Sequence, residues 1–199
     1  MRISIADYGV GNLHSISKGL EKAGAEIEVV SDMSRLLDAE CIVFPGVGAF
    51  GAAMEKLEPV LPGLSAMIAS GTPALGVCLG MQIMFDRSEE SVGEGLGVFR
   101  GDVKRLNAPR VPQMGWNDVA WTEDSLFESV SKGSQFYFAN SYVCYPAEDV
   151  SVAVTEYGDR FPAAVRKRSL CGVQFHPEKS GPPGLRLLSN FVAIAEEGI

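Results

Sequence analysis

The first half of the chain alternates short apolar strands with stretches of helical periodicity, and this pattern restricts the possible folds more than any other feature. Alternation of this kind predicts an α/β fold with a mostly parallel central sheet and helices on both faces. Ligands of such sheets bind beyond the carboxyl ends of the strands, so functional residues are expected there. Strands are expected at residues 3–6, 27–30 and 41–44 and in the run into Cys78, and helices at residues 13–23, after Ser31, and at residues 52–57 and 61–70.

From about residue 97 onward the chain is rich in strand signals instead. Such a succession of short strands and turns predicts a β-rich antiparallel extension of the sheet. No stretch of the chain reads as a long linker, so we expect a single domain over residues 1–199. Strands are expected at residues 97–106, 116–121, 135–138, 151–156, 163–167 and 171–176, and a closing helix at residues 185–195.

Composition argues against several classes of partner. The 199 residues carry a formal net charge of −8 without a basic stripe, which disfavours nucleic acids and anionic membranes. No apolar run approaches the roughly 20 residues of a membrane span, and the first residues form a short strand rather than a secretory signal, which favours a cytoplasmic protein. We expect no metal and no cofactor, because the cysteines lack the spacing of a zinc site or a disulfide framework and read as free thiols: Cys41, Cys78, Cys144 and Cys171.

Cys78 stands where a buried strand turns at once into a helix. Helix N-termini stabilise thiolates, because unpaired backbone N–H groups and the helix dipole favour negative charge. Gly76 and Gly80 let backbone approach the sulfur, and the N–H of Leu79 is placed to donate to an oxyanion, as in the strand-to-helix elbows of α/β hydrolases. Cysteine is also among the most buried residue types, so a structural core cysteine is the alternative interpretation.

A cysteine nucleophile usually needs an imidazole beside it, and the chain has only two histidines. His14 lies off the apolar stripe of the first helix and is expected to be an exposed surface residue. His176 ends a strand and precedes Pro177, which favours extended backbone at the histidine. Residues two apart in extended backbone point to the same side, so Glu178 is expected to hold the ring as the third member of a triad. A solvated His-Pro-Glu turn is the alternative.

A glycine-rich loop at residues 45–51 follows the strand at residues 41–44. Thiolate attack on an acyl carbon creates an oxyanion that needs two donors, and the elbow supplies only the N–H of Leu79. The N–H of Val47 is the candidate for the second donor, and the glycines on both sides of it would let that peptide reorient. Removing one such donor typically costs roughly 2.7–4 kcal/mol of transition-state stabilisation. A tight strand-to-helix turn without a catalytic role is the alternative.

Two motifs together resemble those of the class I glutamine amidotransferases, whose triad is Cys, His and Glu: GVCLGMQ at residues 76–82 and GVQFHPE at residues 172–178. Within that class, further segments are similar to the glutaminase subunits of imidazole glycerol phosphate synthase: residues 7–13, 45–48, 112–117 and 175–181. The similarity covers essentially the whole chain. It implies a flavodoxin-like amidotransferase fold and the hydrolysis of glutamine to glutamate and ammonia.

The resemblance also implies a division of labour. Cys78 would attack the glutamine side-chain amide, His176 would protonate the departing ammonia and then activate water, and Glu178 would orient His176. The ammonia would pass to a separate (β/α)8-barrel cyclase subunit, in a heterodimer that forms imidazole glycerol phosphate and aminoimidazole carboxamide ribonucleotide. Further positions carried over are the substrate contacts Gln82, Glu90, Ser141 and Tyr142 and the synthase-interface residues Asn12, Trp116 and Lys179.

Two positions depart from the family, which commonly has histidine at both Gln113 and Asn140. The first lies beside the expected interface and raises the alternative of a paralogous glutaminase that supplies ammonia to a different synthase, such as one that aminates surface sugars. A stand-alone cysteine hydrolase and a catalytically silent binding subunit are further alternatives. Gln82 would otherwise be a helix-surface residue, and Glu90 would form a solvated acidic pair with Glu89.

Overall fold

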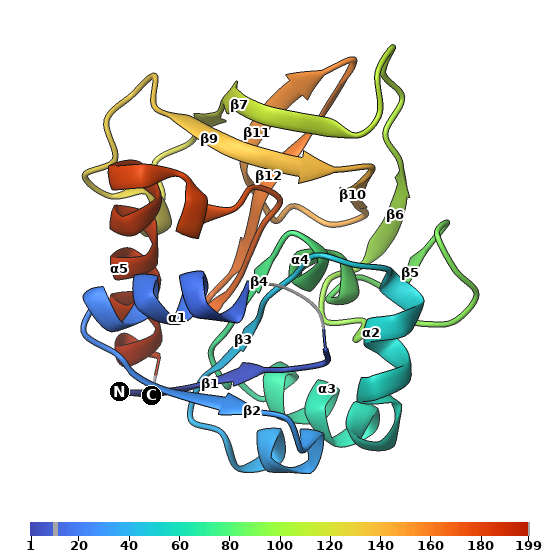
Figure 1. The fold of residues 1–199 in the computed structure, drawn as a ribbon, viewed down its shortest axis with the longest axis vertical. Helices are drawn as coiled ribbons and strands as arrows, with labels where there is room; N and C mark the ends of the chain where they lie inside the picture. The colour runs from blue at the N-terminus through green and yellow to red at the C-terminus, as the bar shows by residue number, and fades with distance from the viewer. Residues whose placement is uncertain (10–11, 199) are drawn as a thin grey trace.

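The computed structural model describes residues 1–9 and 12–198, and its centre is an eight-stranded mixed sheet (Figure 1). The first five strands in spatial order are parallel, and the last three continue the sheet with antiparallel pairing. The predicted parallel sheet with an antiparallel extension is therefore confirmed. The spatial order is β2 (Glu26–Val30), β1 (Arg2–Ala6), β3 (Ile42–Phe44), β4 (Ala74–Val77), β13 (Leu170–Val173), β12 (Asp159–Lys167), β11 (Ser151–Tyr157) and β8 (Ala120–Trp121).

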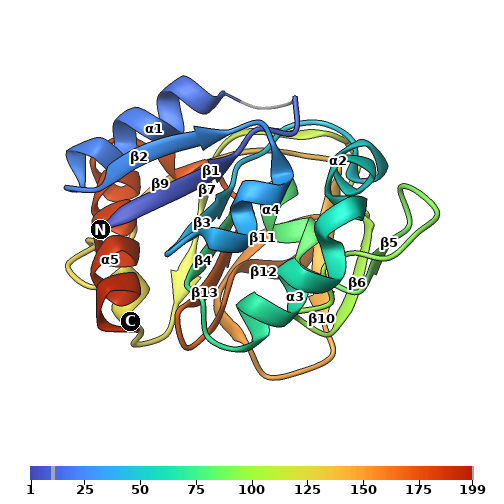
Figure 2. The ribbon, with the colours of Figure 1, turned by 90° about the horizontal axis from the view of Figure 1, so that it is seen from below.

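Helices cover both faces of this sheet, as predicted (Figure 2). On one face lie α1 (Leu13–Lys22) and α5 (Gly181–Glu197), and on the other α2 (Phe50–Leu57), α3 (Leu61–Ala69) and the 3-10 helices η1 (Met33–Asp38) and η2 (Glu58–Val60). Each face has its own cluster of buried apolar side chains. Burying a large apolar side chain stabilises a fold by about 1.5–3 kcal/mol, so the two clusters hold the sheet from both sides.

Two smaller sheets complete the fold. One pairs β7 (Gln113–Asp118) with β9 (Gln135–Asn140), and the other contains β10 (Tyr142–Pro146), β6 (Gly101–Arg105) and β5 (Arg87–Ser88). The strand predicted at residues 116–121 is divided between two sheets, because the chain leaves β7 after Asp118 and β8 then pairs with β11. Neither β5 nor β10 was predicted, and a further 3-10 helix, η3 (Ser125–Phe127), precedes β9.

The last helix begins earlier than predicted. Its first residue is Gly181 rather than Leu185, and prolines occupy its first turn. Proline is tolerated there, because the first N–H groups of a helix have no partner within the helix. The preceding strand is shorter than predicted, since β13 ends at Val173.

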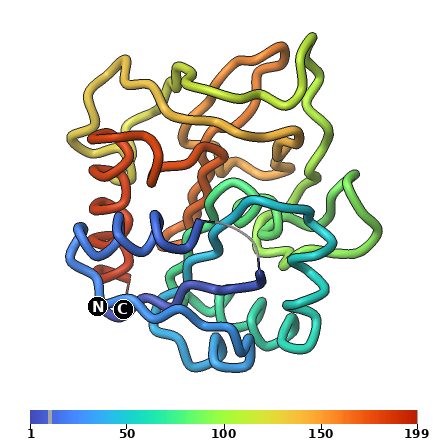
Figure 3. The backbone as a smooth tube through the Cα atoms, viewed as in Figure 1, coloured from blue at the N-terminus to red at the C-terminus, as the bar shows by residue number. Residues whose placement is uncertain are grey.

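The start of β1 and the end of α5 lie side by side (Figure 3), and the Met1 amino group is 3.6 Å from a carboxylate oxygen of Glu196. Within the described part of the chain, every helix is too short or too polar to cross a membrane.

The register of the parallel strands brings three chain segments to one edge of the sheet. Val77 lies opposite Val173, and the N–H of Cys78 donates to the Val173 carbonyl at 2.7 Å. On its other side, β4 pairs with β3, which leads into the glycine-rich loop. The glycine-rich loop, Cys78 and the segment that follows β13 therefore meet at the carboxyl ends of their strands, where the alternating pattern predicts functional residues.

Gly80→Ala is expected to destabilise the fold by at least about 3 kcal/mol, because such overpacking forces backbone to move. A Cβ atom at residue 80 would lie 1.8 Å from the backbone oxygen of Phe44. The free energy of unfolding is measured by urea denaturation. Gly63→Ala is the matched control, since its Cβ would meet only the flexible end of Leu37, at 3.1 Å. Equal stability of the two variants would contradict the tight contact at Gly80.

Candidate active site

Cys78 occupies a strained turn between β4 and the short helix α4 (Leu79–Ile83). Its φ of 52° lies in the left-handed region that residues other than glycine rarely adopt, so the predicted strand-to-helix elbow is confirmed. Close packing surrounds the turn, since a Cβ at Gly76 would lie 2.5 Å from the backbone oxygen of Gly80. Although Cys78 is only 5% exposed, its side of the elbow lines a cavity, which a purely structural cysteine does not require.

His176 and Glu178 form a buried pair near Cys78. The ring Nδ1 is 2.8 Å from Oε1 of Glu178, and the two side chains are 2% and 5% exposed. The path of the chain differs from the prediction: His176 is extended, but η4 (Pro177–Lys179) is a 3-10 turn. The carboxylate thus returns to the ring through a turn, and the alternative of a solvated turn is wrong because the pair is buried.

Opposing effects set the pKa of His176. Burial lowers it, but interactions with Cys78 and Glu178 outweigh burial and raise the pKa to about 9. The imidazolium form is therefore favoured at neutral pH. The other ring nitrogen, Nε2, is buried without a conventional hydrogen-bond partner among the described residues. A protonated ring in this position has a proton to give to a leaving group at the sulfur.

The other three cysteines lack such surroundings. All four are free, as predicted, and buried. Burial raises the pKa of Cys41 and of Cys144 far above the usual range and raises that of Cys171 to about 12. Thiols that stay neutral are poor nucleophiles, so Cys78 is the cysteine whose position beside an imidazole suits covalent chemistry.

A cavity of about 150 Å³ lies at Cys78. Its walls come from the glycine-rich loop, the elbow, the start of α4, the segment after β5 and the junction of β9 and β10. A volume of this order suits a single amino acid better than a peptide. The cavity brings together the predicted oxyanion and substrate residues Val47, Leu79, Gln82, Glu90, Ser141 and Tyr142.

The glycine-rich loop packs directly on the elbow. A Cβ at Gly46 would lie 2.6 Å from the Cβ of Leu79, so only glycine allows this approach. The hydroxyl of Tyr8, which is itself buried, donates to the carbonyl of Pro45 and anchors the start of the loop. Val47 and Leu79 consequently belong to adjoining segments, as the prediction of a shared oxyanion hole requires.

Two polar side chains of the cavity wall have defined partners. Gln82 is 5% exposed and its Nε2 donates to the Tyr142 carbonyl at 2.9 Å, so it is not a helix-surface residue. Oε2 of Glu90 accepts from the N–H of Phe50 at 2.7 Å, at the first residue of α2. Glu90 is therefore half-buried and engaged, whereas its neighbour Glu89 is exposed.

Gln174 is the residue of this region that was not predicted. It is fully buried, and its Nε2 donates to the Cys78 sulfur at 3.5 Å. Its Oε1 accepts from Nε2 of Gln82 at 3.3 Å. The available signal was its spacing, because residues two apart in extended backbone share a side and Gln174 lies two residues before His176.

The predicted interface residues lie around the outer side of His176. Asn12 is exposed and caps α1 by accepting from the N–H of Ser15, at 3.2 Å. Together with Lys179, it lines a second cavity of about 50 Å³ that also borders His176 and Glu178. Within the segment at residues 7–13, Val10 and Gly11 lie outside the described residues. His14 is exposed, as predicted.

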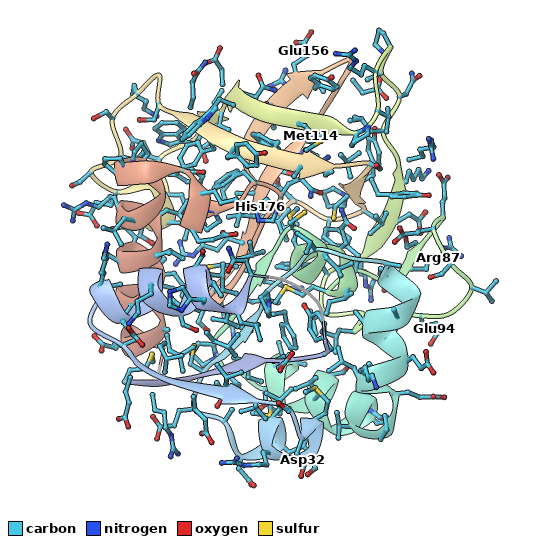
Figure 4. The ribbon with its side chains drawn as sticks, viewed as in Figure 1. Asp32, Arg87, Glu94, Met114, Glu156 and His176 are labelled. Atoms are coloured by element: carbon cyan, nitrogen blue, oxygen red, sulfur yellow. The ribbon has the colours of Figure 1, made fainter. Side chains whose placement is uncertain are left out.

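An exposed apolar strip on β7 adjoins this region, and Figure 4 labels its residue Met114 together with His176. Met114 is 68% exposed and Trp116 is 54% exposed. The Trp116 ring lies edge-on to Tyr137, with centroids 6.2 Å apart, and Nζ of Lys179 is 5.7 Å from the Tyr137 centroid. Tyr137 in turn lies 6.5 Å from the ring of His176. Through this shared tyrosine, Trp116 and Lys179 belong to one continuous surface next to the buried pair.

The two positions that depart from the resembled family are direct partners. Gln113 of β7 lies opposite Asn140 of β9, and both are buried, at 2% and 4% exposure. Asn140 also lines the cavity at Cys78.

Over residues 1–9 and 12–198, no group of three or more His, Cys, Asp or Glu side chains is placed to hold a metal ion.

Comparisons with known proteins agree with this geometry. Residues 4–195 match the family model described as glutamine amidotransferase class-I. The imidazole glycerol phosphate synthase subunit HisH of Thermococcus kodakarensis is 49% identical over 197 residues, which cover 95% of this chain and 98% of that protein. The protein of the same name from Methanocaldococcus jannaschii is 44% identical, with 96% and 99% covered.

Solved structures share the fold. A structure described as a glutamine amidotransferase superposes with a TM-score of 0.77 at 19% identity, covering 98% of both chains. PurLQS from Thermotoga maritima has a TM-score of 0.75 at 21% identity, covering 96% of this chain and 97% of that one. From the match over nearly its whole length, the chain belongs to the class I glutamine amidotransferase family.

Proposed function

We propose that this chain hydrolyses glutamine to glutamate and ammonia as the glutaminase subunit of an imidazole glycerol phosphate synthase. The observation that carries the chemistry is that Cys78, which lines a cavity of about 150 Å³, lies beside the buried pair of His176 and Glu178. The synthase is supported by the relatives named HisH, of which one is 49% identical. As parts of the same proposal, residues 1–199 form one glutaminase domain that works in the cytoplasm.

In this mechanism the Cys78 thiolate attacks the side-chain carbonyl carbon of glutamine and forms a tetrahedral intermediate. The His176 imidazolium gives its proton to the departing nitrogen, so the C–N bond breaks and ammonia leaves a thioester on Cys78. Neutral His176 then takes a proton from water, whose oxygen attacks the thioester. Collapse of the second intermediate breaks the C–S bond, releases glutamate and restores the thiolate and imidazolium. Glu178 orients the ring and stabilises its charge throughout.

The cavity wall supplies the remaining contacts. N–H groups of Val47 and Leu79 would donate to the oxyanion of both intermediates, where donors stabilise charge that is absent from the substrate. Gln82 and Glu90 present acceptors that suit the α-ammonium group of glutamine. Backbone groups of Ser141 and Tyr142 would hold its carboxylate, which does not depend on the side chain at Asn140.

The ammonia has to reach a second active site, and we propose that the (β/α)8-barrel cyclase subunit docks on the face that carries Asn12, Trp116 and Lys179. Trp116 and Met114 are exposed in this chain. Aromatic and apolar side chains of this kind are typical of the centres of interfaces, where a partner buries them. A cavity of about 50 Å³ is lined by Asn12 and Lys179 of this face and also by His176, which supports a route for ammonia on this side of the active site. The HisH names of the relatives favour this partner over an enzyme that aminates surface sugars.

Glutamate release from glutamine is expected to be weak for the isolated chain. It should rise strongly when a cyclase subunit of such a synthase and its nucleotide substrate are added, because docking would align the Val47 peptide.

Cys78→Ala should abolish glutamine use while the complex still accepts ammonium salts. Full activity of the isolated chain would contradict the partner dependence, and joint loss of both activities in Cys78→Ala would contradict the division of labour.

Histidine titration tests the buried pair. Because its pKa is raised to about 9 above the usual 6.5, His176 should stay protonated at neutral pH and lose its proton as pH rises through about 9. Glu178→Gln removes the charged partner and should lower this midpoint. With only two histidines in the chain, NMR of the ring protons resolves the titration, and His14→Gln assigns the second signal. A His176 titration midpoint that is the same in Glu178→Gln as in the wild type would contradict the proposed role of Glu178.

Glu90 offers a test of substrate contact separate from its contact with α2. Glu90→Gln keeps an oxygen that can accept from the Phe50 N–H, but it removes the negative charge for an ammonium group. The KM of the Glu90→Gln variant for glutamine should rise about tenfold or more with kcat little changed, as expected for the loss of a charge-assisted hydrogen bond. Glu90→Ala loses both contacts, so kcat should fall as well. Identical kinetics of the two variants would exclude the contact with α2 as a contribution to turnover.

A further inference from the structure

Every side-chain hydrogen bond of Gln174 in the described structure is with a residue of the active site. Its Nε2 donates to the Cys78 sulfur at 3.5 Å, and its Oε1 accepts from Gln82 at 3.3 Å. The side chain is completely buried, and a buried polar group costs free energy unless it is hydrogen-bonded. A nonpolar side chain would fill this buried position without that cost, so packing alone does not explain the amide.

The backbone holds Gln174 rigidly in this position. The register of β13 on β4 places Val173 opposite Val77, so the next residues of both strands, Gln174 and Cys78, are neighbours. The N–H of Gln174 donates to the Ala163 carbonyl at 2.9 Å, which ties it to β12 as well. Its side chain therefore approaches the sulfur from a fixed backbone.

We propose that Gln174 is a positioning residue of the glutaminase reaction: its amide holds the Cys78 sulfur with one end and sets the orientation of Gln82 with the other. This inference rests on the proposed function of Cys78 as the nucleophile. An N–H donor to sulfur stabilises the anionic form, because hydrogen bonds to charged acceptors are stronger than those to neutral ones. The bond also restricts rotation of the side chain at the moment of attack.

The second half of the proposal concerns Gln82. Its Nε2 donates both to the Tyr142 carbonyl, at 2.9 Å, and to Oε1 of Gln174. Both amide hydrogens are thereby used, and Oε1 of Gln82 remains as an acceptor for the cavity. The Tyr142 carbonyl and Gln174 together thus ensure that Gln82 presents an acceptor, which matches an ammonium donor on the substrate. One buried amide links the substrate wall to the nucleophile.

Gln174→Met tests both halves, because methionine has a similar length and shape but neither a donor nor a strong acceptor. Alkylation of Cys78 by iodoacetamide at neutral pH should slow about tenfold, which is the effect of losing one hydrogen bond to a charged group. With the cyclase partner present, kcat should fall about tenfold while KM rises only a few-fold. Gln82→Met should show the opposite split, with a larger change in KM than in the alkylation rate.

The matched control is Gln135→Met, since Gln135 is an exposed glutamine on β9 whose side chain, among the described residues, bonds only to Asp118. Cys78→Ser measures the background alkylation of the buried thiols, and a urea midpoint for each variant shows that it is folded. If Gln174→Met does not fold, Gln174→Asn retains the amide but is one methylene shorter, and it should slow alkylation to the same extent.

The outcomes separate the two proposals. Alkylation and kcat within twofold of wild type in Gln174→Met, or in Gln174→Asn if the methionine variant does not fold, would overturn the role of Gln174. Slowed alkylation in a chain that releases no glutamate from glutamine with its partner would overturn the proposed function instead, while leaving the contact between Gln174 and Cys78 supported.

Discussion

The parallel pairing of β4 with β13 is the contact on which the candidate active site depends. The N–H of Cys78 donates to the Val173 carbonyl at 2.7 Å, and this bond joins segments from the two halves of the chain. Closing so long a loop costs chain entropy, which burial of the two apolar clusters on either side of the sheet has to offset. With the pair in register, Gln174 donates to the sulfur and His176 lies near it.

The strained backbone of Cys78 is held by its surroundings rather than by its own preference. A left-handed φ at such a residue costs about 1–3 kcal/mol and persists only where packing determines it. Here the turn is enclosed by contacts that only glycine permits, at Gly46, Gly76 and Gly80. These glycine contacts turn the sulfur toward the cavity and also place the glycine-rich loop against Leu79. One set of contacts therefore organises both the nucleophile and the proposed oxyanion donors.

Much of the architecture was predictable because its signals are local. Alternating apolar periods identified the parallel strands and the helices on both faces, and the strand-to-helix break at Cys78 identified the elbow. The errors occurred where long-range pairing decides: β10 forms because β6 lies beside it, and residues 116–121 divide between two sheets. The early start of α5 at Gly181 was not predicted for another reason. Proline occurs both in loops and in the first turn of helices, so the prolines after Gly181 do not distinguish the two.

The sequence by itself determined which groups are available for chemistry. It contains two histidines, one of them in a His-Pro-Glu motif, and a single cysteine at a strand-to-helix turn. Only the tertiary structure decided how these groups are coupled: Glu178 reaches the ring through a 3-10 turn, Gln174 donates to the sulfur, and Gln113 lies opposite Asn140. The physical reason is that residue type and local periodicity follow from the chain, whereas hydrogen-bond partners depend on strand register, which is set by packing between distant segments.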